Sequence, residues 1–160
     1  MEIRRPFGRW LDEFVIGDTY HHGPGRSLTD FDNMWASLLA LDLDSRWLDE
    51  SAAKAAGLPA RPINPMLVFS IAISMSIPDV SGRGLGNLGY DSLIQHAEVF
   101  PGDTIYARST VLEVRQSKSK PDRGPVYVLT EAMNQHDEVV LSVHRRTMVQ
   151  SRPAEMGACS

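Results

Sequence analysis

The chain has 160 residues, 42% of them hydrophobic and 22% charged, which is enough for one globular domain with a buried core. Its formal net charge of −4 excludes a general attraction to DNA or RNA. The single cysteine, Cys159, excludes an internal disulfide and a zinc site made of several cysteines.

Residues 1–10 are charged and lack the apolar stretch of a signal peptide. The most apolar run, residues 66–77, is too short to span a bilayer. We therefore expect a cytoplasmic protein that binds neither a membrane nor a nucleic acid.

The first element expected along the chain is a lead-in strand over residues 8–20, where Phe14, Ile16 and Tyr20 provide alternating apolar positions. Residues 21–25, His-His-Gly-Pro-Gly, are expected to form a loop. Glycine and proline interrupt both helical and strand periodicity, so the pattern favours a break there.

Two short helices follow. Thr29 is a favourable N-cap for a helix that runs through Leu41, and acidic residues in its first turn suit the helix dipole. A second helical stretch is predicted over residues 48–56, ending at Gly57, a natural C-terminal cap.

A proline-rich loop over residues 58–65 leads into a third helix, over residues 66–76. Pro65 suits the first turn of that helix, where its missing N–H costs little. The helix is apolar almost all round, which is typical of a buried helix rather than an amphipathic one.

The rest of the chain predicts four strands separated by turn residues, at 86–100, 103–116, 125–135 and 138–149. An antiparallel sheet around one apolar helix is among the few ways to bury such a helix in a small domain. The predicted architecture is therefore α+β, with residues 151–160 as a flexible C-terminal tail.

Five stretches give the chain a recognisable pattern: Gly-Arg-Trp-Leu-Asp-Glu-Phe at 8–14, Gly-Arg-Ser-Leu-Thr-Asp at 25–30, Ile-Pro-Asp-Val-Ser at 77–81, Asn-Leu-Gly-Tyr at 87–90 and Val-Phe-Pro-Gly-Asp-Thr at 99–104. In these stretches the chain resembles the MaoC-like hydratase/dehydratase family, over about residues 8–150. The branch that includes mesaconyl-CoA-type hydratases is the most similar.

This resemblance implies a single hotdog domain over residues 1–150, with the 66–76 helix at its centre. It implies a homodimer whose sheets join edge to edge, and a tunnel at the subunit interface for a pantetheine arm and an acyl chain. Family members add water to trans-2-enoyl thioesters of CoA or acyl carrier protein, or remove it from 3-hydroxyacyl thioesters. They need no metal or redox cofactor.

The family's acid/base pair is missing one member here. Hydration needs a base to activate water and an acid to protonate Cα. The family uses an aspartate and a histidine five residues apart, in the motif Asp-x-Asn-Pro-x-His. The matching stretch at 42–47 has Asp42 at the aspartate position, Asp44-Ser45 in place of Asn-Pro, and Trp47 at the histidine position. An indole does not exchange a proton near pH 7.

A second departure concerns the N–H that holds the thioester oxygen as negative charge develops on it. In the family this donor lies in a His-Gly-Met stretch at the start of the central helix. The matching residues are Asn64, Pro65 and Met66, and proline has no N–H. The donor would have to be the Met66 N–H or the Asn64 side-chain amide.

Other residues provide replacement chemistry. The candidate catalytic groups are Asp42, Asn64 and His96, and the residues expected around the substrate are Arg46, Trp47, Asp44, Asp49, Pro65, Met66 and Tyr90. A carboxylate in a dry tunnel can act as an acid or a base, and Arg46 can bind an anion. The imidazoles of His21 and His22 are further candidates.

Each assignment has a simpler alternative. Asp42 also reads as a helix-end acid, Asn64 as an N-cap and Arg46 as a surface charge. Tyr90 and Trp47 also read as packing residues, and His96 as a surface histidine. The basic residues between 115 and 123, and the Arg145-Arg146 pair, either meet the phosphates of CoA or a carrier protein or lie on a solvated surface.

The predicted function is addition or elimination at the β-carbon of an acyl thioester, with an altered catalytic site. Three alternatives stay open: conjugate addition of an amino acid to an enoyl thioester in specialised metabolism, a hotdog thioesterase that uses Asp42 or Asp49, and a non-catalytic subunit of a hotdog heteromer.

Overall fold

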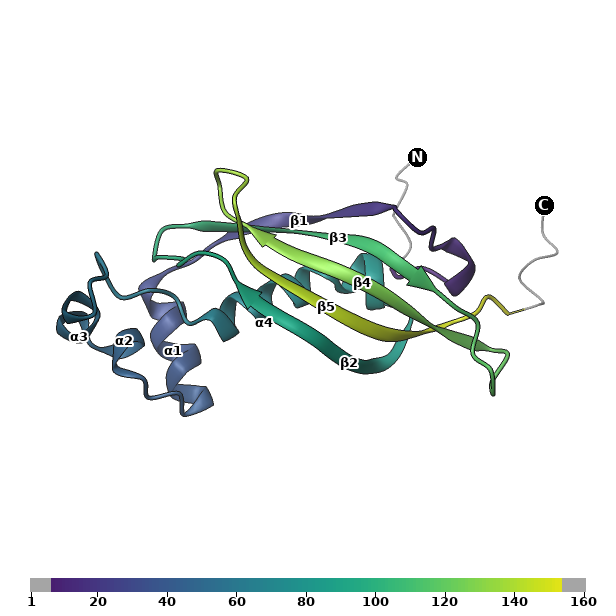
Figure 1. Ribbon diagram of the computed structural model, residues 1–160, viewed down its shortest axis with the longest axis horizontal. Coiled ribbons are helices and arrows are strands. Elements are labelled where there is room, and N and C mark those ends of the chain that lie inside the picture. Colours follow the sequence, from purple (N-terminus) through teal and green to yellow (C-terminus); the bar gives the residue numbers. More distant parts are fainter. Residues whose placement is uncertain (1–6, 154–160) are drawn as a thin grey trace.

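The computed structural model describes residues 7–153, which form a five-stranded antiparallel sheet curved around one central helix (Figure 1). The strands lie in the order β1-β3-β4-β5-β2. Their bounds are β1 Thr19–Ser27, β2 Gly84–Gln95, β3 Thr104–Val114, β4 Arg123–Met133 and β5 Val139–Gln150. This α+β hotdog arrangement confirms the predicted fold.

The helices are η1 Leu11–Glu13, α1 Asp30–Ala40, α2 Ser45–Leu48, α3 Glu50–Ala55, the central α4 Pro65–Ser76, and a π-helix, η2 Ile77–Ser81. Helices α1, α2 and α3 gather beyond one end of the sheet, beside the start of α4 (Figure 1). No helix among residues 7–153 is long and apolar enough to cross a membrane.

The expected lead-in strand and loop are corrected by the structure. Residues 8–18 contain the short helix η1, and the first strand, β1, begins at Thr19 and runs through residues 21–25. That strand lies at the sheet edge and pairs only with β3, with a register shift between His22 and Arg26. Proline is tolerated there, because an edge strand has free N–H positions on one side.

The helical predictions differ in detail from the structure. Thr29 caps α1 as predicted: its Oγ1 accepts from the Asp32 N–H at 3.2 Å. The expected 48–56 helix is observed as α3, Glu50–Ala55, which begins where the Asp49 side chain accepts from its first N–H groups; the short helix α2, Ser45–Leu48, precedes it and was not predicted. Helix α4 occupies the predicted position, with Pro65 in its first turn.

Helix α1 turns polar residues toward the protein and apolar ones outward. Asn33 and Ser37 are completely buried. The large apolar side chains of the same helix are exposed, among them Phe31, Trp35, Leu38 and Leu39. An exposed apolar face of this kind usually marks a contact surface.

The core contains two apolar clusters separated by a layer of polar residues. The first cluster lies around Val68, Ile71 and Ile105, and the second around Val80, Val111 and Val128. Buried polar residues lie in sequence between members of the two clusters. They are Ser76, Ser109 and Thr130, then Ser142, Arg145 and Thr147 of β5, together with His22 of β1.

The expected tail falls largely outside the described residues, which end at residue 153. Within them, the Arg152 guanidinium lies 3.1 Å from Asp12 and 2.7 Å from Glu13.

Candidate functional site

A polar cluster at the start of α4 is built around Asn64, whose side chain is 3% exposed. Its Oδ1 accepts from the Met66 N–H at 2.9 Å and so caps the helix. Its Nδ2 donates to Asp42 Oδ2 at 2.7 Å and to Ser37 Oγ at 3.3 Å. The structure therefore joins Asp42 and Asn64, two of the candidate catalytic residues.

The end of α1 places Asp42 in this cluster. Leu41 adopts a left-handed conformation with φ of 55°, which turns the chain back on the helix. The Asp42 N–H donates to the Ser37 carbonyl at 2.9 Å. The second oxygen of the Asp42 carboxylate accepts from the Asp44 N–H at 3.4 Å. Asp42 is half-buried, so its carboxylate remains within reach of a small reactant.

The side chain of Asn33 supports the cluster, although Asn33 was not among the predicted site residues. Its Nδ2 donates to the carbonyls of Trp47 at 3.2 Å and Pro62 at 3.0 Å, while its Oδ1 accepts from the Asn64 N–H at 2.8 Å. One buried amide thus ties α1, α2 and the start of α4 together. The i, i+4 spacing of Asn33 and Ser37 on a helix places them on the same face, and this was the available signal.

The candidate oxyanion donors are engaged inside the cluster. The Met66 N–H is used by the Asn64 cap, and both hydrogens of the Asn64 amide are directed at Asp42 and Ser37. Pro65 has no N–H. The chemically distinctive group is therefore the Asp42 carboxylate, held by a neutral amide donor.

Arg46, Asp44 and Trp47 form a second group beside the first. Asp44 caps α2 and pairs with the Arg46 guanidinium at 2.7 Å, and these hydrogen bonds lower the pKa of Asp44. The guanidinium lies over the Trp47 ring, 4.9 Å from its centroid. Trp47 is 6% exposed and packs in the interior. The motif position that holds a histidine in the family is therefore taken here by a buried indole, which is not titratable.

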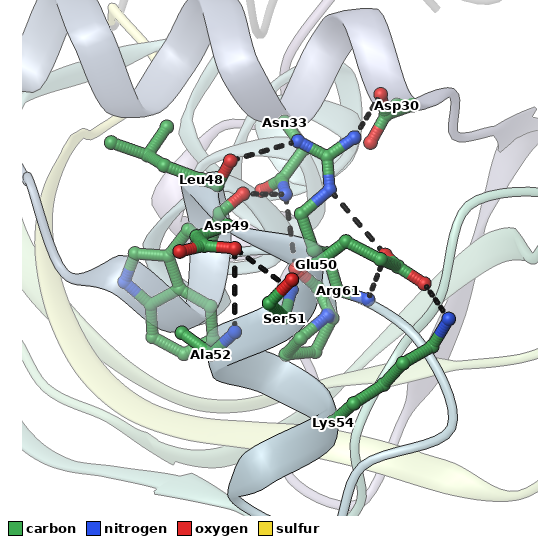
Figure 2. A network of polar contacts seen from close by, with 11 residues as sticks. Asp30, Asn33, Leu48, Asp49, Glu50, Ser51, Ala52, Lys54 and Arg61 are labelled. Atoms are coloured by element: carbon green, nitrogen blue, oxygen red, sulfur yellow. Dashed lines mark hydrogen bonds and ion pairs between the residues drawn. The ribbon is translucent and has the colours of Figure 1, made fainter.

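Figure 2 shows how Arg61 links the helices α1, α2 and α3. The Arg61 guanidinium donates to Asp30 at 2.6 Å and to the Leu48 carbonyl at 3.2 Å. Asp49 lies in the same network, where its carboxylate accepts from the Ser51 N–H at 2.8 Å. The structure thus places Asp49 as the cap of α3, and no hydrogen bond among residues 7–153 joins it to Asp42.

His96 and Tyr90 lie outside the Asn64 cluster. His96 is exposed just after β2, and its Nε2 lies 2.8 Å from Ser142 Oγ. Tyr90 lies on β2 and packs edge-to-face on Phe69 of α4, with ring centroids 5.3 Å apart. Neither residue forms a hydrogen bond with Asp42 or Asn64 among the described residues.

His22, expected in a loop, belongs to a buried chain of polar groups. Its Nδ1 lies 2.9 Å from Asp79 Oδ2 and its Nε2 lies 2.9 Å from Ser109 Oγ. Arg9 holds the other oxygen of Asp79 at 2.9 Å. The order of groups resembles a hydrolytic triad, but Ser109 is completely buried and also bonds Thr130. We therefore assign this chain of groups a structural role.

An open cavity of about 570 Å³ lies between β1 and the second half of α4. Its walls include Gly23 and Arg26 on one side and Ser70 and Met75 on the other. Asp42 and Asn64 are not among its lining residues, so the cavity and the Asn64 cluster are separate features.

Comparisons with known proteins agree on one family. A model of the mesaconyl-CoA hydratase family matches residues 3–158. The mesaconyl-CoA hydratase of Cereibacter sphaeroides is 32% identical over 145 residues, which cover 91% of this chain and 42% of that protein.

Two solved structures show the same fold. A MaoC-domain dehydratase of Chloroflexus aurantiacus has a TM-score of 0.90 at 34% identity, over 95% of this chain and 43% of that one. A Mycobacterium tuberculosis protein with a double hotdog fold has a TM-score of 0.83 at 26% identity, over 92% and 46%. The chain spans less than half the length of these relatives.

Proposed function

Because the chain belongs to the mesaconyl-CoA hydratase family, within the MaoC-like hydratases and dehydratases, we propose that it adds water to an enoyl-CoA or removes it from a 3-hydroxyacyl-CoA. The observation that carries this proposal is the contact of 2.7 Å between the Asp42 carboxylate and the Asn64 amide at the start of the central helix. CoA is the favoured carrier, since the matching relatives are named for CoA thioesters.

Asp42 acts as the general base in this proposal. Its carboxylate takes a proton from water, and the water oxygen forms a bond to the β-carbon of the enoyl thioester. The electron pair of the double bond moves toward the thioester oxygen, and the proton held by Asp42 then passes to Cα. One carboxyl group therefore serves for both transfers, and no metal or redox cofactor takes part.

Asn64 fixes the Asp42 carboxylate and keeps it oriented while its charge changes. Since both of its amide hydrogens are engaged in the free protein, substrate binding must displace the Ser37 contact, the longer one at 3.3 Å, before Asn64 can donate to a thioester oxygen. Asn33 and Ser37 are positioning residues in this scheme, because they act through Asn64.

A second candidate reaction is conjugate addition of an amino acid to the same enoyl thioester. Trp47 occupies the place of the second titratable group and is buried, so the site lacks a second acid/base group for activating water. An amine carries its own lone pair, and Arg46 near Asp42 is a cation that could hold the carboxylate of an amino acid.

We further propose that the working unit is a dimer joined along β2. The edge strand β2 exposes Leu88 and Ile94, of which 54% and 48% is accessible. An uncovered apolar edge strand tends to associate. The double hotdog fold of the Mycobacterium tuberculosis relative places two such domains in one chain, which supports a second copy as the partner here.

The test is a mass-spectrometric assay with mesaconyl-CoA and crotonyl-CoA, in buffer alone and with a panel of amino acids. We expect the product to gain one water, and the rate to fall about 10²- to 10⁴-fold in Asp42→Asn. The matched control is Asp49→Asn, which keeps a good helix cap and should retain activity.

Each other outcome has a defined meaning. A gain of one amino acid would assign carbon–nitrogen bond formation, and release of free CoA would assign a thioesterase. No change of any substrate would favour a non-catalytic subunit and contradict the proposal. Full activity of Asp42→Asn would remove Asp42 from the mechanism.

A further inference from the structure

Helices α1, α2 and α3 form a unit of their own beyond one end of the sheet (Figure 1). We call this unit, residues 29–62, the helical flap. Arg61 links all three helices, because its guanidinium contacts Asp30 of α1, the carbonyl of Leu48 in α2 and Glu50 of α3 (Figure 2). A displacement of one of these helices is therefore passed on to the other two.

The helical flap also has an interior that is separate from the core. Trp47 is 6% exposed and Ala53 is completely buried. No described residue between 29 and 62 belongs to either of the two apolar clusters. Asn33 adds a polar link inside the flap, since its Nδ2 donates to the carbonyls of Trp47 and Pro62. These contacts hold the flap together as one body.

Both connections of the flap to the rest of the chain are fixed to one loop, residues 99–103, between β2 and β3. Before the flap, Leu28 exchanges two backbone hydrogen bonds of 2.8 Å with residues 102–103. After the flap, the Ile63 N–H donates to the Val99 carbonyl at 2.7 Å. Leu28 and Ile63 are both buried in the core. Two anchored connections on one short loop are the arrangement of a hinge.

A single residue outside the flap holds it against α4. Among residues 7–153, three hydrogen bonds that are at least partly buried join the flap to the rest of the molecule beyond the hinge, and all three end on Asn64. Asn33 Oδ1 accepts from the Asn64 N–H at 2.8 Å. Ser37 Oγ and Asp42 Oδ2 accept from its Nδ2 at 3.3 and 2.7 Å. Asn64 is therefore the latch of the flap.

Polar contacts, rather than burial of apolar surface, hold α1 in place. Its buried residues are Asn33 and Ser37, while its large apolar side chains are exposed. The exposed ion pair between Arg26 and Asp32 contributes little, since water screens it. When the flap opens, water replaces the lost hydrogen bonds of the neutral groups. Opening the flap should therefore need less free energy than opening the sheet around α4.

We propose that the helical flap swings as one body about its two connections, and so opens and closes the site at Asp42. Asp42 travels with the flap while Asn64 stays on α4. Opening therefore separates the two residues and frees both amide hydrogens of Asn64, and closing brings the carboxylate over a bound thioester. Such a closure completes the catalytic arrangement only when a substrate is present. The motion stands on the contacts above, whereas its purpose rests on the proposed function.

The experiment measures how fast buried cysteines react with iodoacetamide in the 160-residue chain, after the single native cysteine, Cys159, is replaced by serine. Ser37→Cys places the probe between the flap and Asn64, Ala53→Cys inside the flap, and Ala72→Cys in the core; all three positions are completely buried. Each rate is divided by the rate of the same variant in urea, which removes differences in thiol reactivity. We expect Ser37→Cys to react at least about tenfold faster than the other two variants.

Two further substitutions test the latch and the link between the helices. Asn64→Ala removes two of the three latch bonds and should raise the Ser37→Cys rate about fivefold. Arg61→Met should raise the Ala53→Cys rate, because the interior of the flap then opens separately. The matched control is Lys54→Gln, which removes an exposed ion pair of α3 and should leave both rates unchanged.

A rate for Ser37→Cys as low as that of Ala72→Cys would overturn the inference. Equal and high rates for Ser37→Cys and Ala53→Cys would show that the flap unfolds instead of swinging, which overturns it as well. Should Ala53→Cys or Ala72→Cys not fold, the effect of Asn64→Ala on Ser37→Cys still decides the question, since an unchanged rate would remove Asn64 as the latch.

Butyryl-CoA, a saturated thioester that cannot undergo addition, tests the purpose of the motion. At about ten times its Kd it should slow the modification of Ser37→Cys about tenfold, because the flap closes over it. If butyryl-CoA binds in calorimetry but leaves this rate unchanged, the inference fails while the proposed function stands. If butyryl-CoA does not bind and Ser37→Cys still reacts fast, the proposed function fails while the motion stands.

Discussion

At the scale of single residues, two groups of buried polar side chains have different consequences. Asn33, Ser37 and Asn64 are neutral and surround one half-buried carboxylate, Asp42. The second group contains titratable side chains, since His22 lies between Asp79 and Ser109. The first group is suited to hold a reactive carboxylate, and the second makes the fold sensitive to pH.

We expect His22 to reduce stability at acidic pH. Burial lowers its pKa, and the attraction of Asp79 offsets this only in part. The unfolded chain then binds the proton more tightly than the folded one. Stability is therefore complete above the unfolded value of 6.5 and is lost as pH falls from there through the folded pKa. The melting temperature should fall between about pH 7.5 and pH 5.

In His22→Gln the melting temperature should be lower at neutral pH and should change less over the same range. Asp79, whose pKa is lowered by Arg9 and His22 against the effect of burial, acts below this window. The control is His136→Gln in an exposed turn. An unchanged slope in His22→Gln would show that another group titrates.

At the scale of elements, helix α4 organises the molecule because each of its ends binds a different polar group. Its first turn is capped by Asn64, which also holds Asp42, and its last residue, Ser76, binds Arg145. The apolar residues between them bury the helix in the curve of the sheet. A change at the cap therefore affects the stability of the helix and the proposed base together.

The variant Asn64→Asp tests this coupling. A carboxylate at the cap still accepts from the Met66 N–H and suits the helix dipole. It would also lie beside the Asp42 carboxylate, because the Asn64 amide nitrogen that it replaces is 2.7 Å from Asp42 Oδ2. Two adjacent carboxylates raise the pKa of one of them, so the pair is most unfavourable when both are ionised.

We therefore expect Asn64→Asp to be less stable than wild type near pH 7, and to recover relative to wild type as pH falls toward 5, because the raised pKa favours the protonated folded state. Urea unfolding at both pH values measures this. Asn64→Ala is the control: it loses the cap, worth about 1 kcal/mol, at both pH values alike. Identical pH dependence in the two variants would contradict the contact with Asp42.

At the scale of the whole molecule, two apolar surfaces are exposed among residues 7–153. One follows the edge strand β2, and the other is the outward face of α1. The chain also spans 42% of the curated relative's length. The dimer proposed above would cover the β2 edge with another copy of the chain.

Sedimentation should therefore give a mass of twice 17.8 kDa at micromolar concentration. The double substitution Leu88→Lys and Ile94→Lys places charges on the β2 edge and should shift the protein to a monomer. Ile16→Lys, at an exposed apolar residue outside β2, is the control and should remain dimeric. A dimeric double variant would place the interface elsewhere, and a monomeric wild type would remove it.

The sequence by itself determined the elements whose signals are local. Helix α4 is apolar all round after Pro65, α1 begins at a good cap, and β3, β4 and β5 alternate over several residues each. These signals depend on neighbours a few residues away, so they can be identified without knowing the fold. Asp42 and Asn64 were also recognisable, from a motif that the chain only partly keeps.

The tertiary structure alone decided the features that depend on distant partners. Strand β1 passes through Gly-Pro-Gly because β3, whose paired residues lie 77 to 91 positions later, pairs with it at the sheet edge. Asn33 supports the cluster because its side chain accepts from the N–H of Asn64, which lies 31 residues away in sequence. Arg145 was expected to contact a phosphate or to lie on a solvated surface, and its burial against Ser76 is visible only when the surrounding strands and α4 are in place. Burial and charge pairing arise from packing between elements, and local sequence carries no record of which elements will meet.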